Sequence, residues 1–179
     1  NMRKLKPKII KNFILDVDGV MTDGKFYYSK EGKILKCFGA DDNDALNILK
    51  PYLNIQFVSG DKKGFSITKK RISDDMKFPL ELVSTIKRID WIKKNFDTKS
   101  TIYMGDGIFD YLVMRDVGYS IATKNADENC KKYANFVTKR IGSDRAVAEA
   151  CIHIANKFFK KVNPYIPLSN STMSGGWQS

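Results

Sequence analysis

The stretch that decides the fold is Phe13-Ile14-Leu15-Asp16-Val17-Asp18-Gly19-Val20-Met21-Thr22-Asp23-Gly24. Its apolar first part, which ends at Leu15, is typical of a short core strand in a parallel sheet, because such strands are buried on both faces. Two carboxylates, Asp16 and Asp18, follow one residue apart and lead into a glycine turn. Ligands of open α/β sheets bind beyond the carboxyl ends of the strands. The stretch therefore predicts a core strand that delivers two acidic side chains to a binding edge.

Two carboxylates this close repel each other, and three interpretations are open at this point. A hard cation such as Mg²⁺ offsets the repulsion, since it prefers oxygen ligands and usually also holds substrate phosphate. Alternatively, the pair divides the work of catalysis, with one group as nucleophile and the other as general acid and base. The third interpretation is an ordinary solvated turn, because aspartate and glycine are common turn residues.

Strand-like and helix-like patterns alternate along the whole chain. The first strand is expected at residues 11–17, and further strands at 54–58, 80–83, 101–104, 119–122 and 136–138. Helices are expected from Asp41, at 63–73 and 85–96, through 112–114, between the last two strands with Asn125 as its cap, and from a cap at Ser143 onwards. This alternation predicts an α/β fold with a doubly wound, mainly parallel sheet.

A β-hairpin is predicted directly after the acidic stretch. Residues 25–29 and 33–38 are rich in aromatic and branched side chains and flank the turn Lys30-Glu31-Gly32. An insertion at this point rims the predicted binding edge. Its apolar side chains need a surface to pack on, and a neighbouring subunit is one candidate.

The domain organisation follows from length and composition. The chain of 179 residues is long enough for one domain with a substantial core, which we place at residues 1–161. Residues 162–179 are rich in Pro, Gly, Ser and Asn, and they predict a flexible or partner-docking tail. Tyr165 and Trp177 are the side chains in this tail that favour docking.

Composition excludes several classes of protein. Hydrophobic residues make up 42% of the chain and aromatic residues 12%, which argues against disorder. No apolar run is long enough for a membrane span, and the basic N-terminal residues lack the apolar segment of a secretory signal. The cysteines and the single histidine form no disulfide or zinc pattern. We therefore expect a cytoplasmic protein.

The net charge of +11 favours anionic partners, whether nucleic acid or small phosphorylated acids. The lysines are spread along the chain, and no signature of a nucleic-acid-binding module is present. A generally basic surface is the plainer interpretation of this charge.

Polar groups follow three of the predicted strands: Asp16 and Asp18, then Ser59-Gly60, then Asp106 with Asp110. Because the carboxyl ends of parallel strands share one edge, we expect these groups to meet. The chemistry that fits is phosphoryl transfer, in which Asp16 attacks phosphorus to form an aspartyl-phosphate. Asp18 protonates the leaving oxygen and then activates water for the second step.

Mg²⁺ is the predicted cofactor of this site. Its candidate ligands are the carboxylates of Asp16, Asp18, Asp106 and Asp110. Asp110 would bind the metal or orient its waters. The hydroxyl of Ser59 and the backbone N–H groups that follow it, beginning with Gly60, are the candidate phosphate ligands.

A cation must also neutralise the negative charge that grows during the reaction. Lys87, early in its predicted helix, is the candidate. Arg88, Lys62 and Lys63 are its rivals, and each lysine has the plainer alternative of a solvated surface position.

Three motifs together resemble the haloacid dehalogenase superfamily: Asp16-x-Asp18-Gly19-Val20-x-Thr22-Asp23-Gly24, Ser59-Gly60, and Gly105-Asp106-x-x-x-Asp110. The Kdo-8-phosphate phosphatase group, which also includes phosphatases for nonulosonate phosphates, looks most similar. The resemblance covers roughly residues 10–160. It implies a Rossmann-like sheet, Mg²⁺, subunits without a cap domain, and tetramers in which neighbours and the C-terminal tail close the site. Counting on from Arg71, which matches a family arginine, places Lys87 at the family's lysine.

The chain departs from the family pattern at three places. The family's Thr-Gly-Arg is Ser59-Gly60-Asp61, so an arginine is lost, with Lys62 or Lys63 as its candidate replacement. The family's Arg-Asp-Gly segment is Asp41-Asp42-Asn43, and the second metal-loop aspartate is Gly107. An aspartate repels a substrate carboxylate that an arginine would bind, so the identity of the sugar acid stays open.

The expected function is that of a Mg²⁺-dependent phosphatase for a small phosphorylated 2-keto-3-deoxy sugar acid, of the Kdo-8-phosphate or nonulosonate-9-phosphate kind. A phosphatase for a different sugar phosphate is the first alternative. A basic nucleic-acid-binding module without catalysis is the second, although neither a nucleic acid nor a membrane is the expected partner. A homotetramer is the expected assembly.

Overall fold

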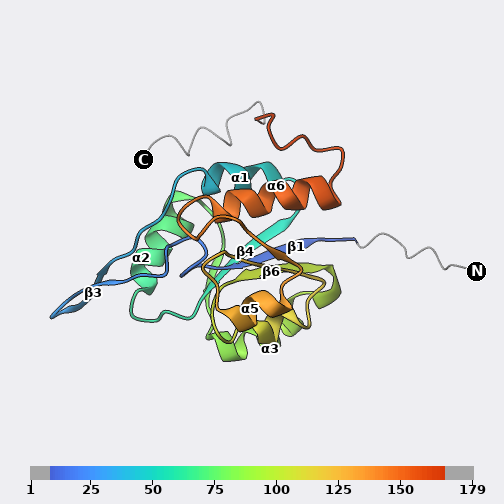
Figure 1. The fold of residues 1–179 in the computed structure, drawn as a ribbon. Coiled ribbons are helices and arrows are strands. Elements are labelled where there is room, and N and C mark those ends of the chain that lie inside the picture. The colour runs from blue at the N-terminus through green and yellow to red at the C-terminus, as the bar shows by residue number, and fades with distance from the viewer. Residues whose placement is uncertain (1–8, 168–179) are drawn as a thin grey trace, which may run out of the picture.

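A six-stranded parallel sheet forms the centre of the protein in a computed structural model, which describes residues 9–167 (Figure 1). The strand order is β5-β4-β1-β6-β7-β8, the doubly wound order in which strands are added outwards on both sides of β1. The elements in chain order are β1 (Asn12–Asp16), β2 (Tyr27–Ser29), β3 (Gly32–Leu35), α1 (Asp42–Leu49), β4 (Asn54–Ser59), α2 (Phe65–Lys69), the π-helix η1 (Lys70–Asp75), β5 (Leu80–Leu82), the 3₁₀-helix η2 (Thr85–Lys87), α3 (Arg88–Asn95), the 3₁₀-helix η3 (Thr98–Ser100), β6 (Thr101–Gly105), α4 (Tyr111–Met114), β7 (Tyr119–Ala122), α5 (Glu128–Tyr133), β8 (Phe136–Val137) and α6 (Ala146–Phe158).

Strand β1 lies between β4 and β6 and is buried along its whole length. Its side chains alternate between the two faces of the sheet, as strand geometry requires. Phe13 and Leu15 belong to the core on one face, and Ile14 belongs to the core on the other. Because Asp16 is two residues after Ile14, its carboxylate emerges on the same face as Ile14.

Helices cover both faces of the sheet (Figure 1). Helices α1 and α6 lie on one face, where the apolar side of α6 packs from Val147 to Ile154. Helices α3 and α5 lie on the opposite face, which has its own core around Ile92, Tyr103 and Cys130. Among residues 9–167, no helix is both long and apolar enough to cross a membrane.

The predicted hairpin is confirmed. Strands β2 and β3 pair in antiparallel fashion and project away from the sheet, at the left of Figure 1. A bridge between Thr22 and Phe38 closes the base of this insertion. Between β1 and α1 the chain forms this hairpin and no separate cap domain.

Two predicted helix caps are wrong. Helix α5 is capped by Asp127, whose side chain accepts a hydrogen bond from the backbone N–H of Asn129, and not by Asn125. Helix α6 begins after Arg145 rather than at a Ser143 cap. Its free N–H at Ala148 instead donates to Asp42 Oδ1, at 2.9 Å, from the start of α1. Asp42, in the first turn of α1, therefore caps the neighbouring helix.

Other predicted elements are found with altered detail. The helix expected at residues 63–73 is a short α-helix, α2, that continues as the π-helix η1. The helix expected at 85–96 starts with the 3₁₀ turn η2. Tyr165 of the predicted tail is exposed in a turn, and residues 168–179, including Trp177, lie outside the described part.

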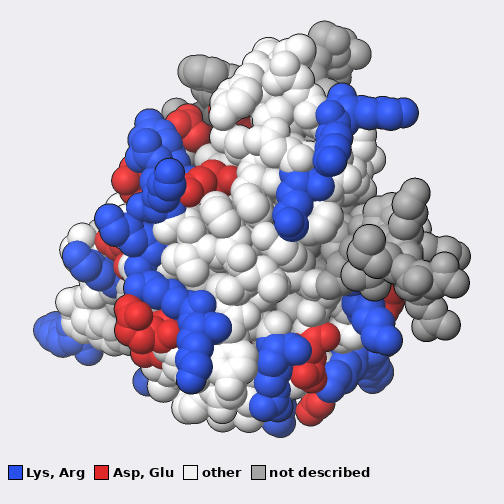
Figure 2. Space-filling model, turned by 45° about the vertical axis from the view of Figure 1, so that its right-hand side comes forward, with Lys and Arg blue, Asp and Glu red and all other residues white. Residues whose placement is uncertain are grey.

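Basic side chains are interspersed with acidic ones over the surface in Figure 2. On this face they stand around a broad area of uncharged residues and do not form one continuous basic stripe. A nucleic-acid-binding groove would require clustered Lys and Arg side chains, so this face offers no support for that alternative.

Candidate active site

The carboxyl ends of β1, β4 and β6 meet at one edge of the sheet, as the sequence predicted. Asp16 is the last residue of β1 and pairs in register with Val58 of β4. Ser59 ends β4, and Asp106 directly follows the last residue of β6. The parallel register therefore brings side chains that are far apart in sequence to the same edge.

Asp16, Asp106 and Asp110 form a compact group of carboxylates. Each offers one oxygen atom, and these atoms all lie within 4.8 Å of one another. Asp16 and Asp110 are buried, and Asp106 is partly buried. Three oxygen donors this close match the ligand preference of a hard divalent cation such as Mg²⁺.

The charges of this group are strongly perturbed. Burial raises the pKa of Asp16 from 3.8 to about 7; the charge of Asp110 adds to the increase, and Arg88 opposes it. Burial also raises the pKa of Asp106 to about 8, with the charges of Asp16 and Asp110 adding to it. A bound divalent cation would stabilise the ionised forms that burial and crowding disfavour. The residues therefore fit a metal ion.

Arg88, rather than Lys87, is the cation that contacts this group. The guanidinium of Arg88 is fully buried, with Nη1 at 3.3 Å from Asp16 Oδ1 and 3.2 Å from Asp110 Oδ1. Lys87 is the last residue of η2; its side chain is exposed and forms no ion pair within residues 9–167. Arg88, named as a rival in the sequence analysis, thus occupies the place expected for Lys87.

Asp110 holds the loop after β6 in position. Its Oδ2 accepts hydrogen bonds from the backbone N–H groups of Asp106, at 3.0 Å, and Gly107, at 2.9 Å. Its Oδ1 accepts from the hydroxyl of Tyr103 at 2.6 Å, and this hydroxyl in turn accepts from Arg88 Nη1 at 2.7 Å. Asp110 therefore organises the loop after β6, and Tyr103 is a site residue that the sequence did not reveal.

Gly19 allows the loop after β1 to approach Asp106. A Cβ atom added at Gly19 would lie 1.8 Å from Asp106 Oδ2, and the residue has a φ of 80° that disfavours other residues. Thr22 Oγ1 accepts hydrogen bonds from the backbone N–H groups of Gly19 and Gly24. From the other side, Asn125 donates to the carbonyl of Gly19 at 3.0 Å, so this loop is held at several points.

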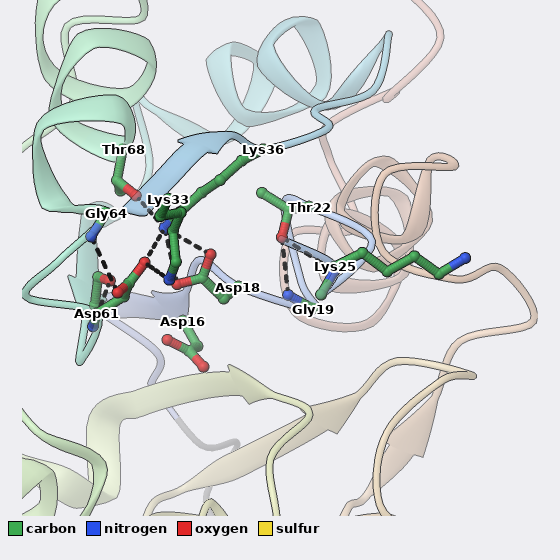
Figure 3. A network of polar contacts seen from close by, with 12 residues as sticks. Asp16, Asp18, Gly19, Thr22, Lys25, Lys33, Lys36, Asp61, Gly64 and Thr68 are labelled. Atoms are coloured by element: carbon green, nitrogen blue, oxygen red, sulfur yellow. Dashed lines mark hydrogen bonds and ion pairs between the residues drawn. The ribbon is translucent and has the colours of Figure 1, made fainter. Parts of the chain in front are cut away.

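The carboxylate of Asp18 lies beside Lys36, which also contacts Asp61 (Figure 3). It does not belong to the carboxylate group of Asp16, Asp106 and Asp110. Instead, Lys36 Nζ lies 2.7 Å from Asp18 Oδ1 and donates to Oδ2 at 3.1 Å. Of the four metal ligands predicted, the structure brings three together and directs the side chain of Asp18 elsewhere.

The predicted phosphate-binding segment lies beside this network. Ser59 is fully buried, and its hydroxyl accepts a hydrogen bond from the backbone N–H of Asp61 at 3.2 Å. Gly60 and Lys62 are exposed, and the side chain of Lys62 has no partner among the described residues. Lys62 therefore remains a prediction as a phosphate contact.

Asp61, directly after Ser59-Gly60, pairs with two lysines of the hairpin segment. Lys33 Nζ binds Asp61 Oδ2, and Lys36 Nζ lies 2.8 Å from the same oxygen. Although burial acts to raise it, these hydrogen bonds lower the pKa of Asp61 to about 2. The sequence pattern placed these lysines in a hairpin but contained no sign that they reach the loop after β4.

Comparisons with known proteins agree with this geometry. A model of the haloacid dehalogenase-like hydrolase family matches residues 84–151. The chain is 29% identical over 156 residues to the 3-deoxy-D-manno-octulosonate 8-phosphate phosphatase of Salmonella typhi, with 82% of this chain and 79% of that protein covered.

The comparison with solved structures also finds Kdo-8-phosphate phosphatases. The cobalt-bound deoxy-D-mannose-octulosonate 8-phosphate phosphatase of Haemophilus influenzae matches with a TM-score of 0.75 and 27% identity, covering 86% of this chain and 91% of that one. The 3-deoxy-D-manno-octulosonate 8-phosphate phosphatase of Moraxella catarrhalis, in complex with magnesium ion, phosphate ion and KDO, matches with a TM-score of 0.71 and 25% identity. The match covers 87% of this chain and 92% of that one.

Proposed function

We propose that this phosphatase, which resembles the Kdo-8-phosphate phosphatases of the haloacid dehalogenase superfamily, removes phosphate from a small phosphorylated 2-keto-3-deoxy sugar acid. The proposed substrates are of the Kdo-8-phosphate or nonulosonate-9-phosphate kind. The observation that carries this proposal is the group of Asp16, Asp106 and Asp110 at the carboxyl ends of β1 and β6, with the buried Arg88 against it.

In the proposed reaction, Asp16 is the nucleophile. Its oxygen attacks phosphorus and forms an aspartyl-phosphate as the ester bond breaks. Arg88, at 3.3 Å from Asp16, favours the ionised form of the nucleophile and neutralises charge that develops on the phosphoryl group. Its burial strengthens this effect, because charges interact more strongly away from water.

Asp18 is the proposed general acid and base. It donates a proton to the leaving oxygen in the first step and takes a proton from the attacking water in the second. Its carboxylate does not belong to the group of Asp16, Asp106 and Asp110, which suits proton transfer better than metal binding through the carboxylate.

Mg²⁺ is the proposed cofactor. Asp16, Asp106 and Asp110 are the side chains that would hold it or its waters, and their oxygen donors fit such an ion. When bound, it supplies charge neutralisation for the nucleophile and the phosphate. The hydroxyl of Ser59 and the backbone after Gly60 are the proposed phosphate ligands, because they end the strand next to β1.

The decisive experiment replaces Asp16 by Asn and measures release of inorganic phosphate with Mg²⁺ present. We expect the loss of at least a factor of about 10⁴, as for removal of a catalytic nucleophile. Asp23→Asn, in the same loop but with a partly exposed side chain, is the control. Undiminished turnover of the Asp16→Asn protein would remove the nucleophile assignment.

The substrate class is tested with a panel of phosphate esters. Asp61 next to the site favours the alternative of a different sugar phosphate, since its carboxylate stands where the Thr-Gly-Arg pattern of the resembled family has an arginine. However, Lys33 and Lys36 neutralise Asp61, which removes the repulsion of a substrate carboxylate. We therefore expect higher kcat/KM for 2-keto-3-deoxy acid phosphates than for hexose phosphates; the reverse ratio would favour the alternative.

A homotetramer is the proposed assembly, and its contact surface is the hairpin. Tyr28 and Leu35 in the hairpin strands are 60% and 58% exposed, which is unusual for large apolar side chains grouped on one element. We expect Tyr28→Glu with Leu35→Glu to lower the mass found by sedimentation velocity. Tyr52→Glu, an exposed aromatic outside the hairpin, is the control. An unchanged mass would rule out the hairpin as the contact.

Cytoplasmic localisation is also proposed. The cysteines Cys37, Cys130 and Cys151 are all free, in agreement with a reducing compartment.

A further inference from the structure

Lys36 connects the hairpin to the proposed general acid. It follows β3 directly, and its side chain is fully buried, which is rare for a lysine. Its ammonium group lies 2.7 Å from Asp18 Oδ1, 2.8 Å from Asp61 Oδ2 and 2.8 Å from Thr68 Oγ1 (Figure 3). These partners come from three different segments of the chain.

The three partners of Lys36 limit the further hydrogen bonds that its ammonium group can donate. An ammonium group has three N–H donors and no acceptor. Asp18, Asp61 and Thr68 take up all three, so Lys36 has no donor left for a substrate phosphate or carboxylate. Its direct effect is therefore on the orientation of Asp18.

We propose that Lys36 is a positioning residue, which holds the carboxylate of Asp18 away from the metal-binding group and toward the leaving oxygen. This proposal rests on the proposed function, since it takes Asp18 as the general acid. The proton moves from the Asp18 carboxyl group to the ester oxygen while the bond from Asp16 to phosphorus forms and the ester P–O bond breaks. The hairpin thereby contributes to catalysis through the residue at its end.

Lys33 provides a matched control within the same cluster. It is also buried and also binds Asp61 Oδ2, but its ammonium lies over the ring of Phe26, at 3.3 Å from the centroid, and does not contact Asp18. Lys33→Met and Lys36→Met each remove one positive charge from the cluster. Only Lys36→Met also removes a contact with the carboxylate of Asp18.

The experiment measures kcat/KM of both variants for two substrates. One is the best alkyl phosphate of the panel, for example 3-deoxy-D-manno-octulosonate 8-phosphate, and the other is p-nitrophenyl phosphate. The nitrophenolate ion leaves without a proton, whereas an alkoxide needs one, and kcat/KM reports the steps up to formation of the aspartyl-phosphate. A loss confined to the alkyl ester therefore identifies a misplaced general acid, while a structural defect lowers both values alike.

For Lys36→Met we expect kcat/KM to fall by about 10- to 100-fold with the alkyl phosphate, a part of what a general acid contributes. The value with p-nitrophenyl phosphate should fall much less, and Lys33→Met should show no such difference between the substrates. If Lys36→Met does not fold, the charge-balanced double variant Lys36→Met with Asp61→Asn is compared with Asp61→Asn alone, and the same substrate-dependent loss is expected.

Equal losses for both substrates in Lys36→Met, or the same pattern in Lys33→Met, would overturn the proposal. The result is separable from failure of the proposed function. If Asp16→Asn and Asp18→Asn are inactive on the alkyl ester while Lys36→Met is not impaired, only the positioning role of Lys36 is lost. If Asp16→Asn is fully active, the proposed function itself is wrong.

Discussion

Arg88 is a fully buried charge whose partners are two acidic side chains, a tyrosine hydroxyl and the backbone carbonyl of Val83. Arg88→Met leaves Asp16 and Asp110 without their positive neighbour, and we expect phosphate release to fall by about 100-fold or more. Lys87→Met, one residue earlier and exposed, should change the free energy of unfolding by no more than about 0.5 kcal/mol. Steady-state phosphate release and urea unfolding of both variants test this; a larger activity loss in Lys87→Met would restore Lys87 as the catalytic cation.

Tyr103 donates to Asp110 and accepts from Arg88, so its hydroxyl joins two groups that the proposed reaction uses. Tyr103→Phe keeps the ring in the core and removes this hydroxyl, with an expected loss of about 1–3 kcal/mol in the free energy of unfolding. Tyr119→Phe is the control, because the Tyr119 hydroxyl makes a single contact, with His153 at 2.8 Å, on the other face of the sheet. Urea denaturation should show the larger loss in Tyr103→Phe, and equal losses would contradict a special role.

At the scale of the elements, the loop after β1 fits against the loop after β6 through Gly19. Gly19→Ala introduces a Cβ at 1.8 Å from Asp106 Oδ2, whereas Gly24→Ala has the same backbone strain, with φ of 79°, and no conflict with Asp106. Both should lose about 1–2 kcal/mol of stability from the positive φ. We expect Gly19→Ala to lose phosphatase activity as well, because Asp106 must move; similar activity of the two variants would show that Asp106 tolerates displacement.

At the scale of the whole molecule, the stability of the metal-free protein depends on pH through the carboxylates of Asp16 and Asp106. The folded-state pKa values of Asp16, about 7, and Asp106, about 8, lie above 3.8, so the folded protein binds more protons than the unfolded chain between these values. Their contribution to stability is complete below about pH 4 and is lost as the pH rises toward 8. Calorimetry without metal should therefore give a lower Tm at pH 8 than at pH 5, and Asp106→Asn should reduce this difference.

Added Mg²⁺ should act in the opposite sense. At 100 times its dissociation constant it is expected to raise the free energy of unfolding by about 2.7 kcal/mol, provided that it binds the folded state alone. The effect should be larger at pH 8 than at pH 5, since protons compete for the same oxygens. Burial also raises the pKa of Asp42 to about 6, so Asp42 adds to the pH dependence of stability whether or not a metal is bound. Comparing Asp42→Asn with the unchanged protein isolates this contribution. Equal stabilisation by Mg²⁺ at both pH values would contradict proton competition at this site.

Local sequence pattern was sufficient for the sheet, the hairpin and the meeting of Asp16, Asp106 and Asp110. Apolar strands that end in polar residues are recognisable without knowledge of the partners, and parallel strands place their ends together whatever the loops do. Helix boundaries and caps were less accessible. Asp42 caps α6 rather than α1, and this depends on how two helices pack, which no short window of sequence contains.

The sequence by itself determined the α/β architecture and the acidic edge of its sheet, because both follow from strand periodicity and from residues directly after strands. Only the tertiary structure decided which cation faces Asp16 and what holds Asp18. Successive residues of a helix point about 100° apart, so the packing of α3 alone selects Arg88 over Lys87. Likewise, Lys36 reaches Asp18 from the segment directly after β3, and this contact joins segments whose patterns are independent of each other.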